Sequence, residues 1–328
     1  MGKAVIYYIL LILISIACIF FFISKNYKFD KEFDTSGTNE ISLTGDMPFI
    51  EPGGYSSKFA VVTNKDINAD AFKNDTYATL LVNRDTKTPI VSFNSLRRIY
   101  PASTTKLMTG IVVCDALNEG KISLDQNVTL THDIVLNEEG AVVSDLKAGY
   151  TISVRNLLYG LMMRSYNDHA MILAELVGGD IDTFCDMMNK KAQEIGATGC
   201  HFKNPHGLHD RDHYITAYDM YLILNEASKY DILNEIDGYK SFSYIYTDAE
   251  GNEHTDDIAP TNMFLDGQCS LPSNITIHEW KTGTTEAAGN ILTMNYEIEG
   301  QHYALFVADG VSPEDLYDKI GILFNMSK

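Results

Sequence analysis

Apolar and polar residues alternate in two short runs near residue 80, and this alternation predicts a pair of β-strands. Tyr77–Arg84 and Pro89–Ser95 are rich in β-branched and aromatic residues. The polar residues between them, Asp85–Thr88, form a turn signal. We therefore predict a β-hairpin over this stretch of the chain.

Between residue 103 and about residue 230, apolar residues recur at spacings of three and four, which places them on one face of a helix. Several segments follow this pattern, and together they predict a lobe made mostly of helices. The segments are Thr104–Leu117, Val154–Met163, His169–Val177, Ile181–Ile195 and Ala217–Ala227.

The last part of the chain returns to strand-like patterns. We predict strands at Ile275–Lys281, Ala288–Ile298 and His302–Ala308, with a hairpin turn around Gly300, and then a closing helix over Pro313–Met326. Strands at both ends and helices between them predict a discontinuous sheet lobe, an inserted helical lobe and a cleft where the two lobes meet.

An apolar run near the N-terminus, Val5–Ile23, contains no charged residue and has about the length, roughly 20 residues, that a helix needs to cross a bilayer. A cleaved signal peptide has a shorter apolar stretch that ends at a small-residue site, so we expect an uncleaved anchor. Lysines lie on both sides of the run, Lys3 before it and Lys25 after it, and charge alone therefore leaves the orientation open.

Charge excludes one class of function. The 328 residues carry a formal net charge of −19 at pH 7, which repels phosphate backbones, and we therefore exclude nucleic-acid binding. With 45% hydrophobic residues, the chain can bury the core of one large domain or two small ones.

The cysteines after the apolar run lack the close spacing of a zinc site or redox pair, which favours buried free thiols. They are Cys114, Cys185, Cys200 and Cys269.

Ser103 and Lys106 stand at the start of the first predicted helix, one turn apart. Residues at this spacing share a helix face, so the amine of Lys106 can approach the Ser103 hydroxyl and, once burial lowers its pKa, act as its base. Ser144 and Lys147 have the same spacing, and serine and lysine at helix starts commonly serve as a cap and a solvated charge. This pair alone therefore does not establish a site.

Two more elements carry candidate chemistry. Ser165-Tyr166-Asn167 is a polar break between two apolar helical segments, and Lys281-Thr282-Gly283 ends a strand-like run. Taken alone, the first is equally an ordinary helix cap and the second an ordinary strand end.

The order of the three elements, S-x-x-K, then S-x-N, then K-T-G, resembles the active-site set of the penicillin-recognising serine enzymes, which include penicillin-binding proteins and class A β-lactamases. Asn204–Leu208 and His213–Met220 resemble the segment between the second and third motifs in low-molecular-mass D-alanyl-D-alanine carboxypeptidases. The resemblance covers residues 77–310. It implies a β-lactamase/transpeptidase-like α/β (α+β) fold, an antiparallel sheet flanked by helices with an inserted helical lobe, to which the sequence adds an N-terminal transmembrane helix.

The resemblance implies a serine D-alanyl-D-alanine carboxypeptidase that removes the terminal D-Ala from peptidoglycan stem peptides. Ser103 attacks the carbonyl of the penultimate D-Ala, Lys106 takes its proton, and Ser165 relays a proton to the leaving D-Ala. The backbone N–H groups of Ser103 and Thr284 form the oxyanion hole, worth about 3–4 kcal/mol per donor. The implied substrate-binding residues are Asn167, Lys281, Thr282, Gly283 and Thr284.

The expected partners are stem peptides ending in D-Ala-D-Ala, β-lactam inhibitors and the membrane, with no nucleic acid, no cofactor and no metal. The expected organisation is a cytoplasmic end at residues 1–4, an anchor at 5–23, an extracytoplasmic stalk at 24–75 and the catalytic domain at 76–328. This makes the chain a single-pass protein of the cell membrane.

Tyr166 and His169 replace residues that are usually small in the family, and we expect them to narrow the cleft.

Three alternatives remain open at this point. A loop cluster of histidines and aspartates suggests a metal site, although its spacing differs from H-E-x-x-H and favours loop hydrogen bonding. A class A-like β-lactamase shares the acylation machinery, but no E-x-x-x-N match lies between Ser165 and Lys281. A non-catalytic penicillin-binding sensor or wall-binding protein needs only the anchor, stalk and cleft. The loop cluster consists of His206, His209, Asp210, Asp212 and His213.

Overall fold

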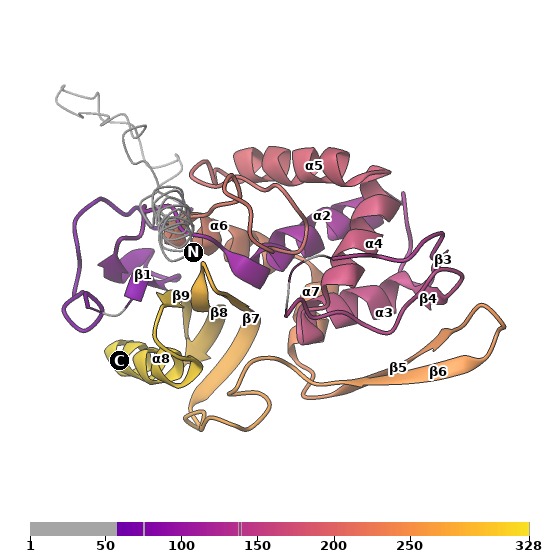
Figure 1. Ribbon diagram of the computed structural model, residues 1–328. Helices are drawn as coiled ribbons and strands as arrows, with labels where there is room; N and C mark the ends of the chain where they lie inside the picture. Colours follow the sequence, from indigo (N-terminus) through magenta and orange to yellow (C-terminus); the bar gives the residue numbers. More distant parts are fainter. Residues whose placement is uncertain (1–57, 75, 137, 139, 328) are drawn as a thin grey trace, which may run out of the picture. The chain divides into compact units, whose positions relative to one another are not determined.

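The main sheet combines strands from the beginning and the end of the described chain. The computed structural model describes residues 58–327, except 75, 137 and 139. Five antiparallel strands lie in the order β2-β1-β9-β8-β7, so an N-terminal hairpin pairs with three C-terminal strands (Figure 1). The strands are β1 (Thr76–Asn83), β2 (Thr88–Phe93), β7 (Ile275–Thr285), β8 (Gly289–Ile298) and β9 (Gln301–Asp309).

Both predicted hairpins are confirmed. β1 pairs with β2 from Thr79↔Phe93 to Asn83↔Thr88. The turn between β8 and β9 consists of Glu299 and Gly300, with φ angles of 53° and 78°. Two consecutive residues with positive φ are typical of the turn whose twist matches that of the flanking strands.

The predicted strand end at Lys281 is wrong. β7 continues to Thr285, because its pairing with β8 runs on from Lys281↔Thr293 to Thr285↔Gly289. The K-T-G motif therefore lies inside a strand rather than at its end. Since β7 is an edge strand, one row of its backbone N–H and C=O groups is not paired within the sheet.

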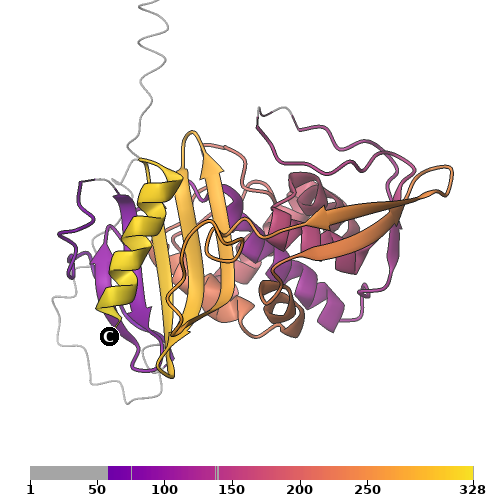
Figure 2. The same ribbon diagram turned by 90° about the horizontal axis from the view of Figure 1, so that it is seen from below.

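The sheet is covered on both faces. α8 (Pro313–Met326), the predicted closing helix, covers one face of the sheet (Figure 2). It shares a hydrophobic cluster there with Leu81 of β1 and Trp280 of β7. Leu80 and Val82 point to the other face, into the core that the sheet shares with the helical lobe. This alternation along β1 is the two-residue period of a strand that is buried on both sides.

The predicted helical segments are all found, with two local changes. The first begins as a short 3₁₀ turn before the α-helix proper, and the second ends in a π-helical turn before Ser165. α2 lies at the centre of the lobe, with ten of its thirteen residues buried. The elements are η3 (Ala102–Thr105), α2 (Lys106–Asn118), α3 (Val154–Tyr159), η4 (Gly160–Arg164), α4 (Asn167–Gly178), α5 (Ile181–Glu194), α6 (Ala217–Ala227) and α7 (Asp231–Asp237).

A second antiparallel sheet was not predicted from the sequence. It has the strand order β3-β4-β5-β6, and its outer pair projects from the helical lobe as a long arm (Figures 1 and 2). The sequence of β6, EHTDDI, contains a single apolar residue, so no alternation of apolar and polar positions marks it as a strand. The strands are β3 (Asn127–Thr129), β4 (Thr151–Ser153), β5 (Phe242–Thr247) and β6 (Glu253–Ile258).

The predicted anchor at 5–23 and most of the predicted stalk at 24–75 lie outside the described residues. Among the helices that the structure does describe, none has both the length and the apolar composition needed to span a bilayer. The cysteines at 114, 185, 200 and 269 are all free thiols; the first two are buried and the others are half-buried.

Candidate active site

A tight 3₁₀ turn carries Ser103 into the site. Thr104 stabilises the turn, since both its Oγ1 and its backbone N–H donate to Pro101 O, at 2.7 and 3.3 Å. Ala102 adopts a positive φ of 47°, which is unfavourable for a residue with a Cβ. The turn ends where α2 begins at Lys106, so the half-buried Ser103 side chain lies one turn before the amine.

Gly207 lies directly against this turn. It has a φ of +90°, and a Cβ at this position would lie 1.8 Å from Ala102 O. We therefore expect Gly207→Ala to destabilise the protein by about 3 kcal/mol or more, from overpacking and backbone strain together, and to displace Ser103. Urea denaturation measures the first effect, and the rate at which the Ser103 hydroxyl is acylated measures the second.

Gly251 provides the matched control, because it has a φ of +86° but no atom within 4 Å of an added Cβ. Gly251→Ala introduces only the backbone strain, about 1–2 kcal/mol. If the two variants lost the same stability, the contact between residue 207 and the 3₁₀ turn that carries Ser103 would contribute nothing to that loss.

The amine of Lys106 is completely buried and contacts three oxygen atoms. Nζ lies 2.9 Å from Ser103 Oγ and donates to Asn167 Oδ1 and to His206 O, both at 2.7 Å. Burial, with a further contribution from the positive charge of Lys281, holds the pKa of Lys106 well below its usual value, while Asp168 opposes this shift. The pair predicted from the S-x-x-K spacing is therefore in hydrogen-bond contact.

These contacts give a neutral Lys106 a defined orientation. An uncharged amine has two hydrogens and one lone pair. The amide oxygen of Asn167 and the carbonyl oxygen of His206 can only accept, so they take the two hydrogens. The lone pair is left to face the Ser103 hydroxyl, which is the geometry of a general base and its nucleophile.

The S-x-N segment brings one of its residues to Lys106 and leaves another unpaired. Asn167 begins α4, and its Oδ1 accepts the bond from Lys106. Ser165 ends the π-helical turn in the left-handed conformation, with φ 67° and ψ 29°. Its Oγ is buried and has no hydrogen-bond partner among the described residues. The structure therefore joins Asn167, but not Ser165, to the catalytic pair by a hydrogen bond.

Tyr166 and His169, the residues expected to narrow the cleft, are both buried. His169 is fully buried, and its ring fills the space that Gly160 leaves, where a Cβ would lie 2.3 Å from His169 Cε1. Tyr166 is 8% exposed, and its hydroxyl donates to Asp256 Oδ2 on β6 at 3.1 Å. The hydroxyl of Tyr244 on β5 donates to the same oxygen at 2.7 Å. The middle residue of S-x-N thus joins the motif to the β5–β6 arm.

The K-T-G motif approaches the catalytic turn from the sheet edge. A Cβ at Gly283 would lie 2.9 Å from the backbone nitrogen of Ser103, so only glycine allows β7 to pass so near. Lys281 is fully buried, with Nζ 3.3 Å from Thr282 O, and burial lowers its pKa to about 7. Thr282 is half-buried, whereas Thr284 is exposed and donates to Asn290 Oδ1 at 3.2 Å.

Two histidines of the loop cluster contact the residues that follow Ser103: His213 contacts Thr105, and His206 contacts Lys106. His213 Nδ1 accepts from Lys203 N at 3.1 Å, so Nε2 carries the hydrogen and donates to Thr105 Oγ1 at 2.8 Å. Burial lowers the pKa of both His206 and His213 to about 3, which keeps the rings neutral. In the part of the chain that the structure describes, no group of three or more His, Cys, Asp or Glu residues could hold a metal ion.

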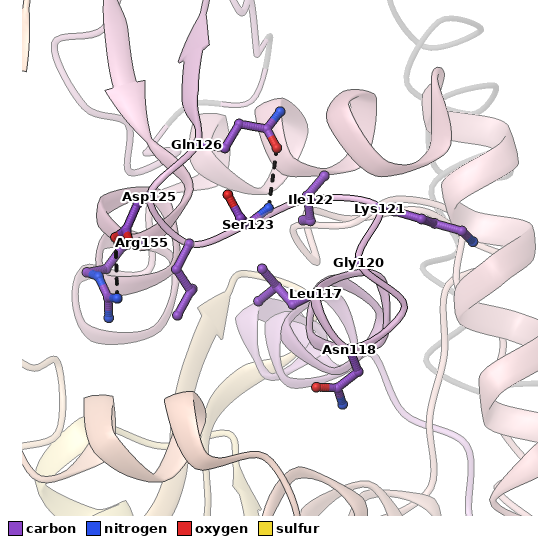
Figure 3. Close-up of a pocket in the computed structure, with 10 residues that line it drawn as sticks. Leu117, Asn118, Gly120, Lys121, Ile122, Ser123, Asp125, Gln126 and Arg155 are labelled. Carbon is purple, nitrogen blue, oxygen red and sulfur yellow. Dashed lines mark hydrogen bonds and ion pairs between the residues drawn. The ribbon is translucent and has the colours of Figure 1, made fainter.

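A surface hollow of about 590 Å³ lies at the C-terminal end of α2, the end opposite to Lys106 (Figure 3). The helix separates the two places by about 20 Å, given its thirteen residues and a rise of about 1.5 Å per residue. Arg155 and Asp125 form an ion pair at its rim, at 3.5 Å. This hollow is therefore separate from the catalytic residues.

The arrangement is that of the penicillin-binding serine enzymes, and the fold agrees with that class. The solved structure of the Streptomyces K15 DD-transpeptidase matches with a TM-score of 0.68 at 26% identity, over 81% of this chain and 98% of that one. Penicillin-binding protein D2 of Listeria monocytogenes, in its cefotaxime-bound form, matches with a TM-score of 0.64 at 22% identity, over 76% of this chain and 96% of that one.

Within this class, the chain belongs to the D-alanyl-D-alanine carboxypeptidase family of serine peptidases, which its residues 63–311 match. The D-alanyl-D-alanine carboxypeptidase DacF of Bacillus subtilis is 36% identical over 159 residues, 48% of this chain and 40% of the relative. The chain thus spans about two fifths of the length of that relative. The family predicted from the three motifs is confirmed.

Proposed function

We propose that this chain is a serine D-alanyl-D-alanine carboxypeptidase that removes the terminal D-Ala from peptidoglycan stem peptides. The observation that carries the proposal is the buried Lys106 amine, 2.9 Å from Ser103 Oγ and directed by two acceptor oxygens, on the fold of this family. A capping serine and a solvated lysine would not require a buried amine with a lowered pKa.

In acylation, Lys106 Nζ takes the proton of Ser103 while Oγ forms a bond to the carbonyl carbon of the penultimate D-Ala. The backbone N–H groups of Ser103 and Thr284 hold the oxyanion. As the C–N bond breaks, the Ser165 hydroxyl donates its proton to the nitrogen of the leaving D-Ala and takes up the proton that Lys106 accepted, so that Lys106 is neutral again. The unpartnered Oγ of Ser165 supports this role, because it is available to a substrate atom. Water then hydrolyses the ester and restores the Ser103 hydroxyl.

The same proposal assigns substrate binding to the remaining motif residues. Asn167, whose Oδ1 accepts from Lys106, uses its amide hydrogens to hold the substrate amide. Lys281 and Thr282 bind the terminal carboxylate, and Gly283 leaves the space in which β7 and the catalytic turn meet. β-Lactams, which carry a comparable carboxylate and a reactive amide, acylate the same serine.

The pH dependence of the reaction should be bell-shaped. Lys106 acts only when neutral, so activity rises with pH through its lowered pKa. Lys281 attracts the substrate carboxylate only when protonated, so kcat/KM falls as pH rises through about 7. Bound carboxylate stabilises the ammonium, which should move the falling limb of kcat to higher pH than that of kcat/KM.

A D-Ala-D-Ala peptide with an amidated C-terminus is the control for this profile. It has no carboxylate to pair with Lys281, so its falling limb near pH 7 should disappear while its rising limb stays. The assignment of the falling limb to Lys281 is wrong when both peptides show the same fall. Initial rates of D-Ala and D-alaninamide release between pH 5 and 10 give the comparison.

Release of D-Ala from a peptide ending in D-Ala-D-Ala, by the full chain in detergent, tests the function directly. A positive result is time-dependent release together with a long-lived penicillin ester on Ser103, found by intact mass and peptide mapping. Rapid turnover of penicillin would instead indicate a β-lactamase. A stable ester without any release of D-Ala would indicate a penicillin-binding sensor.

We also propose that the apolar run 5–23 anchors the chain in the cell membrane once, with residues 1–4 cytoplasmic and residues 24–75 as an extracytoplasmic stalk below the catalytic domain at 76–328. The length of the uncharged run supports this organisation. The test is membrane fractionation after carbonate extraction, with protease added to intact spheroplasts. Recovery of the full chain in the soluble fraction, or protection of its catalytic domain from the protease, would contradict it.

A further inference from the structure

One residue outside the three motifs touches two of the segments that carry them. Thr261 lies where the chain leaves the β5–β6 arm and returns toward β7 (Figure 1). Its backbone N–H donates to Met163 O at 3.1 Å, two residues before Ser165. Its hydroxyl oxygen lies 2.5 Å from that of Thr282 in K-T-G. Nothing in the local sequence marks this threonine as part of a site.

The neighbours of Thr261 hold it in place. Pro260 before it is buried, and Asn262 after it is fully buried, where its Oδ1 accepts from Phe264 N at 3.0 Å. The hydroxyl of Tyr317 on α8 donates to the same oxygen at 3.4 Å. Thr261 is therefore fixed between two rigid contacts while its own side chain stays half-buried beside Thr282.

The short contact between the two hydroxyls has a consequence for anion binding. Each threonine has one hydroxyl hydrogen, and only one hydrogen fits between the two oxygens. When Thr261 donates to Thr282, the hydrogen of Thr282 is left for another acceptor. In the opposite orientation, Thr282 donates its hydrogen to Thr261, and only its lone pairs face an anion.

We propose that Thr261 is a positioning residue for Thr282, which sets the direction of its hydroxyl hydrogen and thereby favours substrates with a free terminal carboxylate. With a carboxylate bound, the chain of donors runs from Thr261 to Thr282 to the anion, and each bond polarises the next. The last bond is charge-assisted and therefore the strongest. The inference rests on the proposed function, since it takes the carboxylate to bind at Thr282.

The test compares three variants of the full chain. Thr261→Val replaces the hydroxyl with a methyl group of similar size, and Thr261→Ser keeps the hydroxyl. Thr255→Val makes the same change at an exposed threonine on β6. For the D-Ala-D-Ala peptide, Thr261→Val should raise KM roughly five- to tenfold with little change in kcat, because one polar interaction is weakened. The amidated peptide should be affected less than twofold, Thr261→Ser should restore KM, and Thr255→Val should behave as the wild type.

A merely structural role predicts a different result. If Thr261 only holds the S-x-N and K-T-G segments together, Thr261→Val lowers kcat/KM equally for both peptides, and that outcome overturns the inference. So does an unchanged KM for the carboxylate peptide, or a failure of Thr261→Ser to restore it. Unfolding temperatures of the variants show whether the fold is retained.

The rate of Ser103 acylation by a penicillin and by its methyl ester separates failure of this inference from failure of the proposed function. A wild-type chain that reacts with penicillin but releases no D-Ala refutes the carboxypeptidase. The inference then still predicts slower acylation in Thr261→Val by the free acid and not by the ester. A wild type that reacts with neither peptide nor penicillin overturns both.

Discussion

Ser103→Ala should reduce the release of D-Ala by roughly 10⁶-fold, the scale of loss seen when a serine hydrolase loses its nucleophile. Without the hydroxyl that faces Lys106 at 2.9 Å, no ester can form, so the penicillin adduct should also vanish from the intact-mass spectrum. The fold should remain, because the turn is stabilised by the bonds from Thr104 to Pro101 rather than by the Ser103 hydroxyl.

Ser144→Ala is the matched control for this variant. Ser144 begins the second S-x-x-K match in the chain, but it donates to Asp168 from a loop and does not contact Lys106 by any hydrogen bond among the described residues. This variant should keep both the adduct and D-Ala release. An adduct that persists in Ser103→Ala, or disappears in Ser144→Ala, would move the nucleophile away from Ser103.

Lys106→Met should slow the acylation of Ser103 by penicillin on the order of 10³-fold, because proton transfer to a positioned base contributes about 10²–10⁴-fold. Lys106→Arg should not recover the rate, since a guanidinium stays protonated and has no lone pair to accept the Ser103 proton. Stopped-flow acylation rates, with circular dichroism to verify folding, measure both effects.

Lys147→Met serves as the control, because Lys147 is exposed and completes the S-x-x-K match that begins at Ser144. It should acylate at the wild-type rate. A normal acylation rate in Lys106→Met would mean that another group accepts the proton, and the base role proposed for Lys106 would be wrong.

The proposed mechanism gives the two buried lysines different tasks, and the charge of Lys281 helps to make their pKa values differ. The charge of Lys281 lowers the pKa of Lys106, which favours a neutral amine beside Ser103. Asp237 opposes the effect of burial on Lys281, which helps this second amine to keep its proton. Below the Lys281 pKa of about 7, a neutral Lys106 together with a charged Lys281 is therefore the favoured combination. In the proposed mechanism, this combination provides a base at Ser103 and a cation for the substrate carboxylate.

Helices and strands were predicted correctly where burial of one face makes apolar residues recur at a regular spacing. α6 and α8 were predicted with the observed bounds, Ala217–Ala227 and Pro313–Met326, because each presents a continuous apolar face to a core. The sequence did not predict β6, because half of its residues are exposed and it carries too few apolar residues to show an alternation. The sequence did not predict that β7 extends beyond Lys281, because pairing with β8, rather than local composition, sets the length of this strand.

Recognisable motifs led to residues that the structure brings together, whereas residues defined by contact could not be found from the sequence. Ser103 and Lys106 follow from a spacing of one helical turn. Thr261 and Gly207 could not be found in this way, since Thr261 contacts the hydroxyl of Thr282 on β7 and Gly207 leaves the space beside Ala102. Tyr166 is unusual in sequence, but its contact with Asp256 on the β5–β6 arm could not be predicted from the motif.

The order of the motifs, the family and the position of the proposed nucleophile can all be read from the printed residues, because they depend on local spacing and local periodicity. The protonation of Lys106 cannot, because it depends on burial and on the charges of Lys281 and Asp168, which are distant in sequence and meet only in the folded chain. Burial and neighbouring charges set the pKa of an amine, and both arise only once the two lobes are assembled.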